Sequence, residues 1–320
     1  MGADRARVVV VGAGIAGVAC GAELARAGVP VRIYERARVA GGRMASKRFD
    51  GRPADLGAAY FTVSDPDFAR VVRGWEAAGL AREWTDTFVA YSADGRREAP
   101  GPVRWAAPRG LRSLVEHLAA DLPVAVDRLV LGVEPGPHVD GERCAAVALA
   151  LPGPQAALLL DPALAAATAA VAAQRWSSTL SGVLRFPARS WPAFRGAFVN
   201  DHPLLRLVCD DGDRRGDGAP VLVAHTTPGF AAGHLAQPTG AAPAVEQAVR
   251  DLLALPERAA HVHVHRWTYA MPAAPAGDAT YHLDADGIGL AGDAFGAPRV
   301  QTAWRSGRDL GRDLAARLRP

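Results

Sequence analysis

Three glycines near the start of the chain are spaced to bind the phosphates of a dinucleotide. They form the pattern Gly-x-Gly-x-x-Gly between a β-branched apolar run at 7–11 and a segment with helical periodicity. The first glycine of such a pattern permits a tight turn, the second lets a pyrophosphate approach the backbone, and the third lets helix and strand pack closely. The N–H groups at the start of the helix then attract phosphate. We predict phosphate contacts from Gly12, Gly14, Ile15, Ala16 and Gly17.

An acidic residue follows these glycines at a distance that suits ribose recognition. Residues 29–34 are typical of a second buried strand, and Glu35 stands at its carboxyl end with Arg36 after it. A carboxylate at this position accepts hydrogen bonds from the ribose hydroxyls of an adenosine, which disfavours a 2′-phosphate there. Strand, glycine turn, helix and acid together predict a complete βαβ dinucleotide unit.

The remaining pattern predicts an α/β fold with a second region of antiparallel strands. Helices are expected over 66–78, 111–121, 156–174, 244–253 and 302–318. Strands are expected over 124–133, 145–151 and 288–291, and strand-like stretches broken by turns over 180–267. We expect a doubly wound (Rossmann-like) domain with an inserted α+β substrate domain of antiparallel sheet and helices. The expected boundaries are 1–75, 107–158 and 284–320 for the first domain, and 76–106 and 159–283 for the second.

Two further motifs accompany the first glycine turn. Residues 41–44 read Gly-Gly-Arg-Met, and residues 290–293 read Leu-Ala-Gly-Asp. With these motifs the sequence resembles the glutathione-reductase-type FAD family, in its amine-oxidase-like branch. The resemblance implies that the second glycine pair and Arg43 line the FAD pyrophosphate and flavin, and that Asp293 holds ribityl or phosphate oxygens. It also implies that a helix starting near Val300 points at the flavin and stabilises the charge of the reduced ring.

The resemblance also indicates how FAD is held. The flavin is expected at the interface between the two domains. No Cys or His stands in 291–304, where a covalent tether is expected, so the FAD is predicted to be noncovalent. Besides the first glycine turn, the implied cofactor contacts are Glu35, Arg36, Gly42, Arg43, Met44, Gly57, Ala58, Ala59, Tyr60, Val130, Gly292, Asp293, Arg299, Val300, Gln301 and Ala303.

Within that superfamily the sequence is most similar to the renalase-like family. The similarity lies in the blocks 41–46, 55–62, 107–111, 225–227 and 292–296. It implies an oxidase that transfers hydride from a 2- or 6-dihydro isomer of NAD(P) to flavin N5 and passes the electrons to O2, giving hydrogen peroxide. No general base is needed, because a dihydronicotinamide becomes aromatic by losing hydride. Two departures are Ala59, where a glutamine is expected, and 133–145, which is shorter and richer in Pro and Gly than the expected β-meander.

Candidate substrate-contacting residues come from the 55–62 block and from the strand-like stretches. The catalytic candidates are Tyr60, Thr62, His225, Trp267 and Tyr269. Three histidines alternate with valines at 261–265, so a strand places all three imidazoles on one face. No carboxylate or cysteine accompanies them in the motif, so a half-polar strand is favoured over a metal site, and no metal is predicted.

A single lysine bears on the alternatives. Lys47 is the only lysine of the chain and follows the Gly-Gly-Arg-Met motif, in the expected FAD domain. Many flavin amine oxidases of the family that this sequence resembles place a substrate-domain lysine near flavin N5. A lysine-assisted amine oxidase is therefore disfavoured, although an amine oxidase or desaturase acting on a small amine or biosynthetic intermediate stays open. A non-enzymatic binding protein on the same fold is disfavoured, because the chain keeps the phosphate glycines and Asp293.

Composition limits the class of protein and of partner. The 320 residues are 49% hydrophobic and 22% charged, which suits a large core and excludes disorder for most of the chain. A net charge of +3 is too weak and too scattered for nucleic acid binding. No stretch is apolar enough for a membrane span, and three widely spaced cysteines exclude a disulfide framework. We expect a soluble cytoplasmic enzyme, monomer or homodimer, whose partners are a small-molecule substrate and O2 rather than nucleic acid or membrane.

Overall fold

The chain folds into two compact units, of which the computed structural model describes residues 7–318. The first unit comprises Met1–Met44, Arg112–Trp176 and Met271–Pro320, and the second comprises Ala45–Leu111 and Ser177–Ala270. This division differs from the expected boundaries, since the second unit contains 45–75 and 107–111 and the first contains 159–176 and 271–283. Strand pairing accounts for part of the difference, because β18 (His282–Leu283) pairs with β19 (Ile288–Leu290) of the first unit.

A doubly wound sheet forms the first unit, as predicted. Its strand order is β18-β19-β12-β1-β2-β8, and every neighbouring pair except β18–β19 runs parallel. The central strand β1 is the valine run Val8–Val11, buried along its whole length, as expected for a parallel strand with helices on both faces. The other strands of the sheet are β2 (Val31–Tyr34), β8 (Val124–Ala125) and β12 (Ala146–Leu149).

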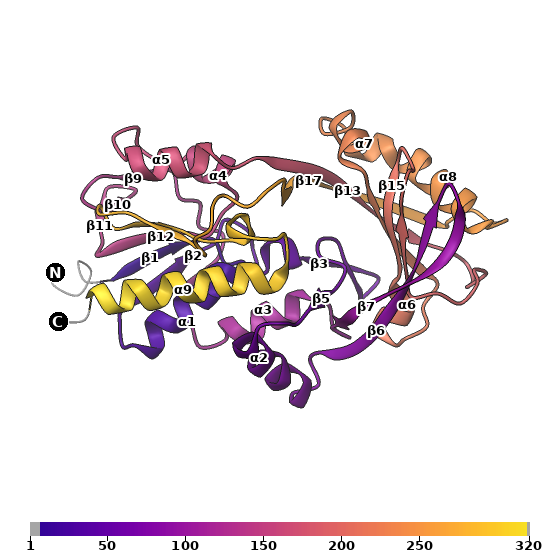
Figure 1. Ribbon diagram of the computed structural model, residues 1–320, viewed down its shortest axis with the longest axis horizontal. Coiled ribbons are helices and arrows are strands. Elements are labelled where there is room, and N and C mark those ends of the chain that lie inside the picture. Colours follow the sequence, from indigo (N-terminus) through magenta and orange to yellow (C-terminus); the bar gives the residue numbers. More distant parts are fainter. Residues whose placement is uncertain (1–6, 319–320) are drawn as a thin grey trace. The chain divides into compact units, whose positions relative to one another are not determined.

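Helices cover both faces of this sheet (Figure 1). On one face α1 (Ile15–Arg26) lies against α9 (Val300–Leu318). The two helices approach closely because glycines of α9 face the backbone of α1, where a Cβ on Gly311 would lie 2.6 Å from a carbonyl oxygen. On the other face α4 (Gly153–Ala157) and α5 (Ala165–Ala172) pack on the side chains of β1 and β12. The predicted closing helix is confirmed as α9, and α3 (Arg112–Ala119) confirms the helix predicted over 111–121.

One predicted helix of this unit is interrupted. The residues expected to form a helix over 156–174 form α4 and α5 instead, with an irregular connection between them. Proline cannot continue a helix, and Pro162 follows Asp161, whose N–H donates to the carbonyl of Val133 (2.9 Å). The connection is therefore drawn toward a neighbouring strand rather than kept in a helix.

One predicted strand of this unit is also shorter than expected. The strand expected over 124–133 is only β8, because Asp127 adopts a positive φ of 52° and turns the chain away from the sheet. The stretch 133–145, which is shorter than the β-meander expected from the resemblance, still forms a small antiparallel meander. Its strands are β9 (Val133–Glu134), β10 (His138–Val139) and β11 (Glu142–Arg143).

The second unit is built on an eight-stranded sheet that is mostly antiparallel. Its strand order is β17-β13-β16-β15-β14-β6-β7-β5, with β14 and β6 parallel. One face packs on α8 (Ala242–Leu253), and the opposite face carries the β3–β4 hairpin and the segment that precedes β5. The bounds are β3 (Ser46–Phe49), β4 (Arg52–Asp55), β5 (Phe61–Thr62), β6 (Arg82–Ser92), β7 (Gly95–Ala106), β13 (Trp176–Arg185), β14 (Gly196–Val199), β15 (Leu205–Asp210), β16 (Val221–Thr226), β17 (His261–Pro272), α2 (Pro66–Ala77), α6 (Asp211–Arg215) and α7 (Pro228–Ala232).

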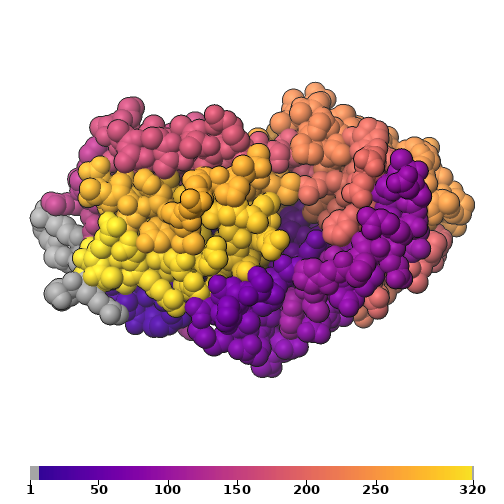
Figure 2. Space-filling model, in the orientation of Figure 1, coloured from indigo at the N-terminus to yellow at the C-terminus, as the bar shows by residue number. Residues whose placement is uncertain are grey.

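Different elements form the surface of each unit. On the face shown in Figure 2, the yellow helix α9 forms much of the surface of the first unit, and the purple β6–β7 hairpin lies at the surface of the second. Within residues 7–318 no helix is both long and apolar enough to cross a membrane. The three cysteines are free and buried, so their thiols are enclosed by the core.

Candidate active site

The first glycine turn contains two glycines that the protein's own packing requires and one that it does not. Gly12 adopts φ +103°, and a Cβ on it would lie 2.7 Å from the carbonyl oxygen of Ala150. A Cβ on Gly17 would come closer than 3.0 Å to the carbonyl oxygen of Gly12, which real Cβ atoms essentially never do. At Gly14 the backbone is extended (φ −75°, ψ 176°), and the atom nearest to an added Cβ is 4.0 Å away. The space beside Gly14 is therefore left for something other than the protein, as a bound pyrophosphate requires.

Helix α1 begins beside that space without a side-chain cap. Gly14 is its N-cap, and no acidic residue stands in its first turn. The first N–H groups of a helix have no partner within the helix and carry partial positive charge. Ile15, Ala16 and Gly17, which were predicted to contact phosphate, form this first turn. The helix start therefore suits an anion.

Glu35 holds the glycine turn in place. Its buried carboxylate accepts hydrogen bonds from the backbone N–H groups of Ala13 (to Oε2, 2.9 Å) and Ala37 (to Oε1, 2.8 Å). The carbonyl of Ala13 accepts in turn from the N–H of Gly41 (2.9 Å), which ties the second glycine motif to the first. A carboxylate offers about four lone-pair sites, so both oxygens of Glu35 keep capacity for the predicted ribose hydroxyls.

We expect Glu35→Gln to weaken FAD binding on the order of ten- to a hundredfold, because a charge-assisted acceptor is worth about 1.5–3 kcal/mol. The new NH2 group must also face one of the two backbone donors, Ala13 or Ala37. Titration of the apoprotein with FAD measures the change. Glu76→Gln, the same substitution at an exposed site on α2, is the matched control and should leave the affinity unchanged. Unchanged affinity in Glu35→Gln itself would place this carboxylate away from the ribose.

Two charged cofactor candidates of the first unit pair with each other. Arg43 Nη1 and Nη2 donate to Asp293 Oδ2 (2.9 Å) and Oδ1 (2.5 Å), a bidentate geometry that fixes both side chains. The Trp176 ring lies against Arg43, with its centroid 5.0 Å from the guanidinium carbon. Nothing lies within 4 Å of a Cβ added to Gly292, which leaves open space beside this pair. Trp176 was not predicted, because an aromatic residue outside a motif carries no signal of its own.

The other predicted cofactor residues of the first unit differ in exposure. The buried ones are Met44, Val130 and Ala303, of which Val130 packs in the core beside β1. The exposed ones are Arg36 and Arg299, and Val300 and Gln301 are the first residues of α9. Gly42 faces the first motif, since a Cβ on it would lie 3.2 Å from Gly14 Cα. Open space at Gly14, an uncapped helix and a buried carboxylate together fit a dinucleotide such as FAD.

In the second unit, hydrogen bonds from other elements hold the segment that precedes β5. The carbonyl of Leu56 accepts from Trp267 Nε1 (2.8 Å) and from the hydroxyl of Ser181. The carbonyl of Ala59 accepts from Arg214 Nη1 (2.6 Å). Trp267, a catalytic candidate, therefore positions this segment through its indole N–H. The segment contains the predicted cofactor residues Gly57, Ala58, Ala59 and Tyr60.

A buried ionic cluster, formed by Arg52, Asp55, Asp211, Arg214 and Arg215, supports the same segment. Asp211 pairs with Arg214, with Arg215 (3.0 Å) and with Arg52 (2.6 Å). Asp55 also pairs with Arg215 (3.1 Å). Burial alone raises the pKa of Asp211, but the charges of its three arginine partners lower it to about 2. The cluster thus carries the guanidinium that fixes the carbonyl of Ala59.

His225 and Tyr60 lie on the face of the sheet opposite α8. Ser181, which bonds Leu56 on that face, is the cross-strand partner of His225. The Nε2 atom of His225 is buried and has no hydrogen-bond partner among residues 7–318. Burial, and then the charge of Arg206, lower the pKa of His225 to about 3, so its imidazole is neutral near pH 7. Burial raises the pKa of Tyr60, which keeps its hydroxyl protonated.

The remaining substrate candidates lie on edge strands of the same sheet. Thr62 pairs with Arg104 across β5 and β7. Tyr269 is half-buried on β17, two positions beyond Trp267, so the alternation of a strand places both on one face. The positive charge of Arg206 thus contributes to the pKa of both His225 and Tyr60. Trp267 instead donates a hydrogen bond to the backbone carbonyl of Leu56.

The single lysine lies on the β3–β4 hairpin in the second unit, not in the first as expected. It is exposed, and Lys47 Nζ lies 3.5 Å from His263 Nε2. The predicted strand of alternating histidines is confirmed as part of β17. Burial, and then the charge of Lys47, lower the pKa of His263 to about 4. Among residues 7–318, no group of three or more His, Cys, Asp or Glu side chains is placed to hold a metal ion.

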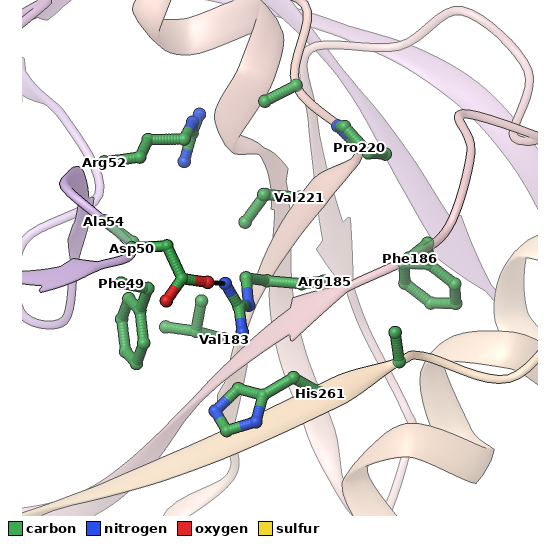
Figure 3. A pocket seen from close by; sticks show the side chains of 12 residues that line it. Phe49, Asp50, Arg52, Ala54, Val183, Arg185, Phe186, Pro220, Val221 and His261 are labelled. Carbon is green, nitrogen blue, oxygen red and sulfur yellow. Dashed lines mark hydrogen bonds and ion pairs between the residues drawn. The ribbon is translucent and has the colours of Figure 1, made fainter.

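A pocket of about 450 Å³ opens between the tip of the β3–β4 hairpin and the strands beneath it (Figure 3). Phe49 and Val183 contribute apolar walls. Two arginines also line the pocket, but Arg185 pairs with Asp50 of the hairpin and Arg52 belongs to the buried ionic cluster. Both charges are neutralised within the protein, so we assign no anion to this pocket.

The residues that support the site in the second unit were missed. The stretch 210–217 reads Asp-Asp-Gly-Asp-Arg-Arg-Gly-Asp, which is typical of an exposed turn. Its residues Asp210, Asp211, Arg214 and Arg215 are nevertheless buried. The one available signal was the i,i+3 and i,i+4 spacing of opposite charges, which lets Asp211 pair with two arginines within one turn.

Comparison with known proteins agrees with this architecture. Residues 10–75 match a family described as an NAD(P)-binding Rossmann-like domain. The chain is similar in structure to cyclohexylamine oxidase from Brevibacterium oxydans IH-35A (TM-score 0.78, 14% identity, covering 98% of this chain and 99% of that one). It is also similar to a putative protoporphyrinogen oxidase from Exiguobacterium sp. 255-15 (TM-score 0.76, 17% identity, covering 97% and 99%). At these identities the likeness concerns the fold.

Sequence matches point the same way. A stretch of 57 residues is 46% identical to hydroxyneurosporene desaturase from Rubrivivax gelatinosus, covering 18% of this chain and 11% of that protein. Residues 73–314, most of the chain, match the family described as flavin containing amine oxidoreductase. The protein therefore belongs to the flavin-containing amine oxidoreductase family and is an FAD-dependent oxidoreductase.

Proposed function

We propose that the protein is a renalase-like oxidase whose substrate is a reduced nicotinamide isomer of the 2- or 6-dihydro type. The observation that carries this proposal is the charge around His225. Burial lowers the pKa of His225 most, and the charges of Arg206 and then Arg214 lower it further, so its imidazole stays neutral. Arg214 is paired with Asp211, whereas Arg206 is no part of the buried ionic cluster. Such a positive field disfavours the ammonium group that an amine carries near neutral pH. It suits a neutral dihydronicotinamide ring whose nucleotide part is anionic.

The residues of this chain contribute binding and orientation rather than proton transfer. Bound FAD supplies the hydride acceptor, and O2 takes up the electrons. The buried Nε2 of His225 offers a hydrogen-bonding position for a carboxamide, and the hydroxyl of Tyr60 stays protonated. Neither side chain has to accept a proton, because a dihydronicotinamide becomes aromatic by losing hydride alone.

An amine oxidase or desaturase is the second candidate. The family description and the names of similar proteins, cyclohexylamine oxidase and hydroxyneurosporene desaturase, favour it. The chain offers such chemistry a single lysine, and Lys47 is an exposed residue of β3 beside His263. The neutral imidazole of His225 and the positive charge of Arg206 acting on it favour the dihydronicotinamide over a cationic amine.

Anaerobic mixing of the FAD-loaded enzyme with a panel of substrates tests the proposal. We expect 6-dihydroNAD(P) to bleach the flavin absorbance, and hydrogen peroxide to appear when oxygen is admitted. Ordinary 4-dihydroNAD(P), which differs only in the position of the reduced carbon, is the matched control and should bleach far more slowly. Rapid bleaching by cyclohexylamine or putrescine, with none by the dihydronicotinamides, would replace the proposal by the second candidate.

Flavin reduction by the true substrate should be nearly independent of pH between about 6 and 9, because no side chain has to titrate. The pKa of His225 is lowered to about 3 and that of Tyr60 is raised, so neither group changes charge in this window.

Lys47→Met should leave the rate within about threefold of wild type, since this exposed group contributes no proton transfer. Stopped-flow bleaching across the pH range measures both effects. A steep profile with a pKa near that of a substrate amine would instead support amine oxidation.

A further inference from the structure

A β-bulge interrupts β15 where it runs beside β16. Leu205 pairs with Thr226 and Leu207 pairs with His225, so Arg206 is the extra residue of the bulge. Bulges re-aim a side chain and are over-represented next to active sites. This bulge lies directly opposite the histidine of the candidate site.

The packing of its neighbours shows which way Arg206 faces. Leu205 and Val208 both belong to the core on the α8 side of the sheet. The two residues between them therefore face the opposite side, where Leu207 packs against a separate buried cluster. In a regular strand Leu205 and Leu207 would share a face. The bulge thus adds an arginine to the face that carries His225.

Arg206 acts electrostatically on both polar candidates of that face. Its positive charge favours the neutral form of His225 and the ionised form of Tyr60. Burial lowers the pKa of Arg206 itself, which means that folding disfavours its charged form. Side chains whose pKa is shifted by burial are common in binding and catalytic sites. There a charged group is kept for function although its burial lowers the stability of the fold.

We propose that Arg206 binds an oxyanion of the substrate, a phosphate or a carboxylate, beside the imidazole of His225. The inference rests on the proposed function, because it assigns a substrate-binding role on the same face. A guanidinium presents a planar fork of N–H donors that matches either oxyanion. A nucleotide substrate would supply phosphate, and a substrate acid would supply carboxylate.

The test compares substrates that differ only in the oxyanion. The reduced 6-dihydronicotinamide riboside lacks phosphate, its mononucleotide carries one phosphate, and the riboside of 6-dihydronicotinic acid carries a carboxylate. Anaerobic flavin bleaching gives kcat/KM for each with the FAD-loaded wild type, Arg206→Met and Arg206→Lys. Calorimetry with the oxidised mononucleotide and the oxidised riboside, which cannot reduce flavin, gives a second readout. Arg185→Met, which removes a positive charge from the same sheet face but from a pair with exposed Asp50, is the matched control.

We expect Arg206→Met to lower kcat/KM for the oxyanion-bearing substrate on the order of ten- to a hundredfold and to leave the neutral riboside within about threefold. The affinity for the oxidised mononucleotide should fall in parallel if phosphate is the ligand, and Arg206→Lys should restore part of the loss. Loss confined to the phosphate arm identifies phosphate, and loss confined to the carboxylate arm identifies a carboxylate. Equal effects on charged and neutral substrates, or no effect in any arm, would overturn the inference.

Failure of the proposed function gives a different result. If no dihydronicotinamide bleaches the wild-type flavin but amines do, the same comparison uses an α-amino acid and the amine that lacks its carboxylate. A loss confined to the amino acid in Arg206→Met then supports the oxyanion role even though the proposed substrate is wrong. Equal losses on the amino acid and the amine reject both assignments.

Discussion

A Gly14→Val protein should fold and yet purify without FAD. Its backbone is extended at this position, and the atom nearest to an added Cβ is 4.0 Å away, so no atom of the protein blocks a Cβ there. The valine would instead fill the space into which a pyrophosphate must come to reach the helix start. We expect a colourless protein with a wild-type far-ultraviolet circular dichroism spectrum, whereas the wild type should bind one FAD per chain.

Two other glycines make this prediction specific. A Cβ on Gly17 would overlap the carbonyl of Gly12, so Gly17→Ala should destabilise the fold itself. At Gly229, in α7, nothing lies within 4 Å of an added Cβ, and Gly229→Ala should leave both FAD content and melting temperature unchanged. Absorbance at the flavin band and thermal melts separate the three outcomes. A folded Gly14→Val protein that keeps stoichiometric FAD would show that the phosphates bind elsewhere.

The fold around the first glycine turn and the FAD cofactor could be predicted because their sequence signals are close together in the chain. The glycine turn and the closing helix depend on spacing within one turn or one helix, and the acid depends on spacing within one βαβ unit. In the structure the Glu35 carboxylate contacts the glycine turn, because it accepts a hydrogen bond from the backbone N–H of Ala13, next to Gly14. The helix over 156–174 was wrong for a local reason as well, because Pro162 can interrupt a helix in spite of alanine-rich neighbours.

The substrate half of the site could not be predicted to the same depth, because its contacts join residues far apart in the chain. Arg214 bonds the carbonyl of Ala59, and Trp267 bonds that of Leu56. A bulge is also silent in a single sequence, since nothing in the residues around Arg206 marks the shift of register that re-aims its side chain. Residue types alone made His225 and Tyr60 candidates, but they gave no signal for Arg206, whose charge acts on both.

Asp211→Asn should reduce the free energy of unfolding by about 3–5 kcal/mol, because it leaves Asp55 as the one carboxylate among the three arginines of the buried ionic cluster. The side chain of Asp211 is 0% exposed, while Arg214 and Arg215 are 1% and 2% exposed. Asp217→Asn is the matched control, since Asp217 pairs with Arg52 from a side chain that is 41% exposed. An exposed partner of this kind is worth about 0–1 kcal/mol. Urea unfolding of the FAD-loaded proteins at neutral pH measures the difference.

The pH dependence of stability provides an independent check on the same carboxylate. The pKa of Asp211 in the folded protein is about 2, below its ordinary value of 3.8. A carboxyl group with a lowered pKa stabilises the fold above its unfolded pKa, and this contribution is lost as the pH falls through the folded pKa. Wild-type stability should therefore fall between about pH 4 and pH 2 more steeply than that of Asp211→Asn, which has no carboxylate to protonate there. Parallel acid profiles for the two proteins, or an Asp211→Asn protein within about 1 kcal/mol of wild type at neutral pH, would show that the arginines of the buried ionic cluster are satisfied without Asp211.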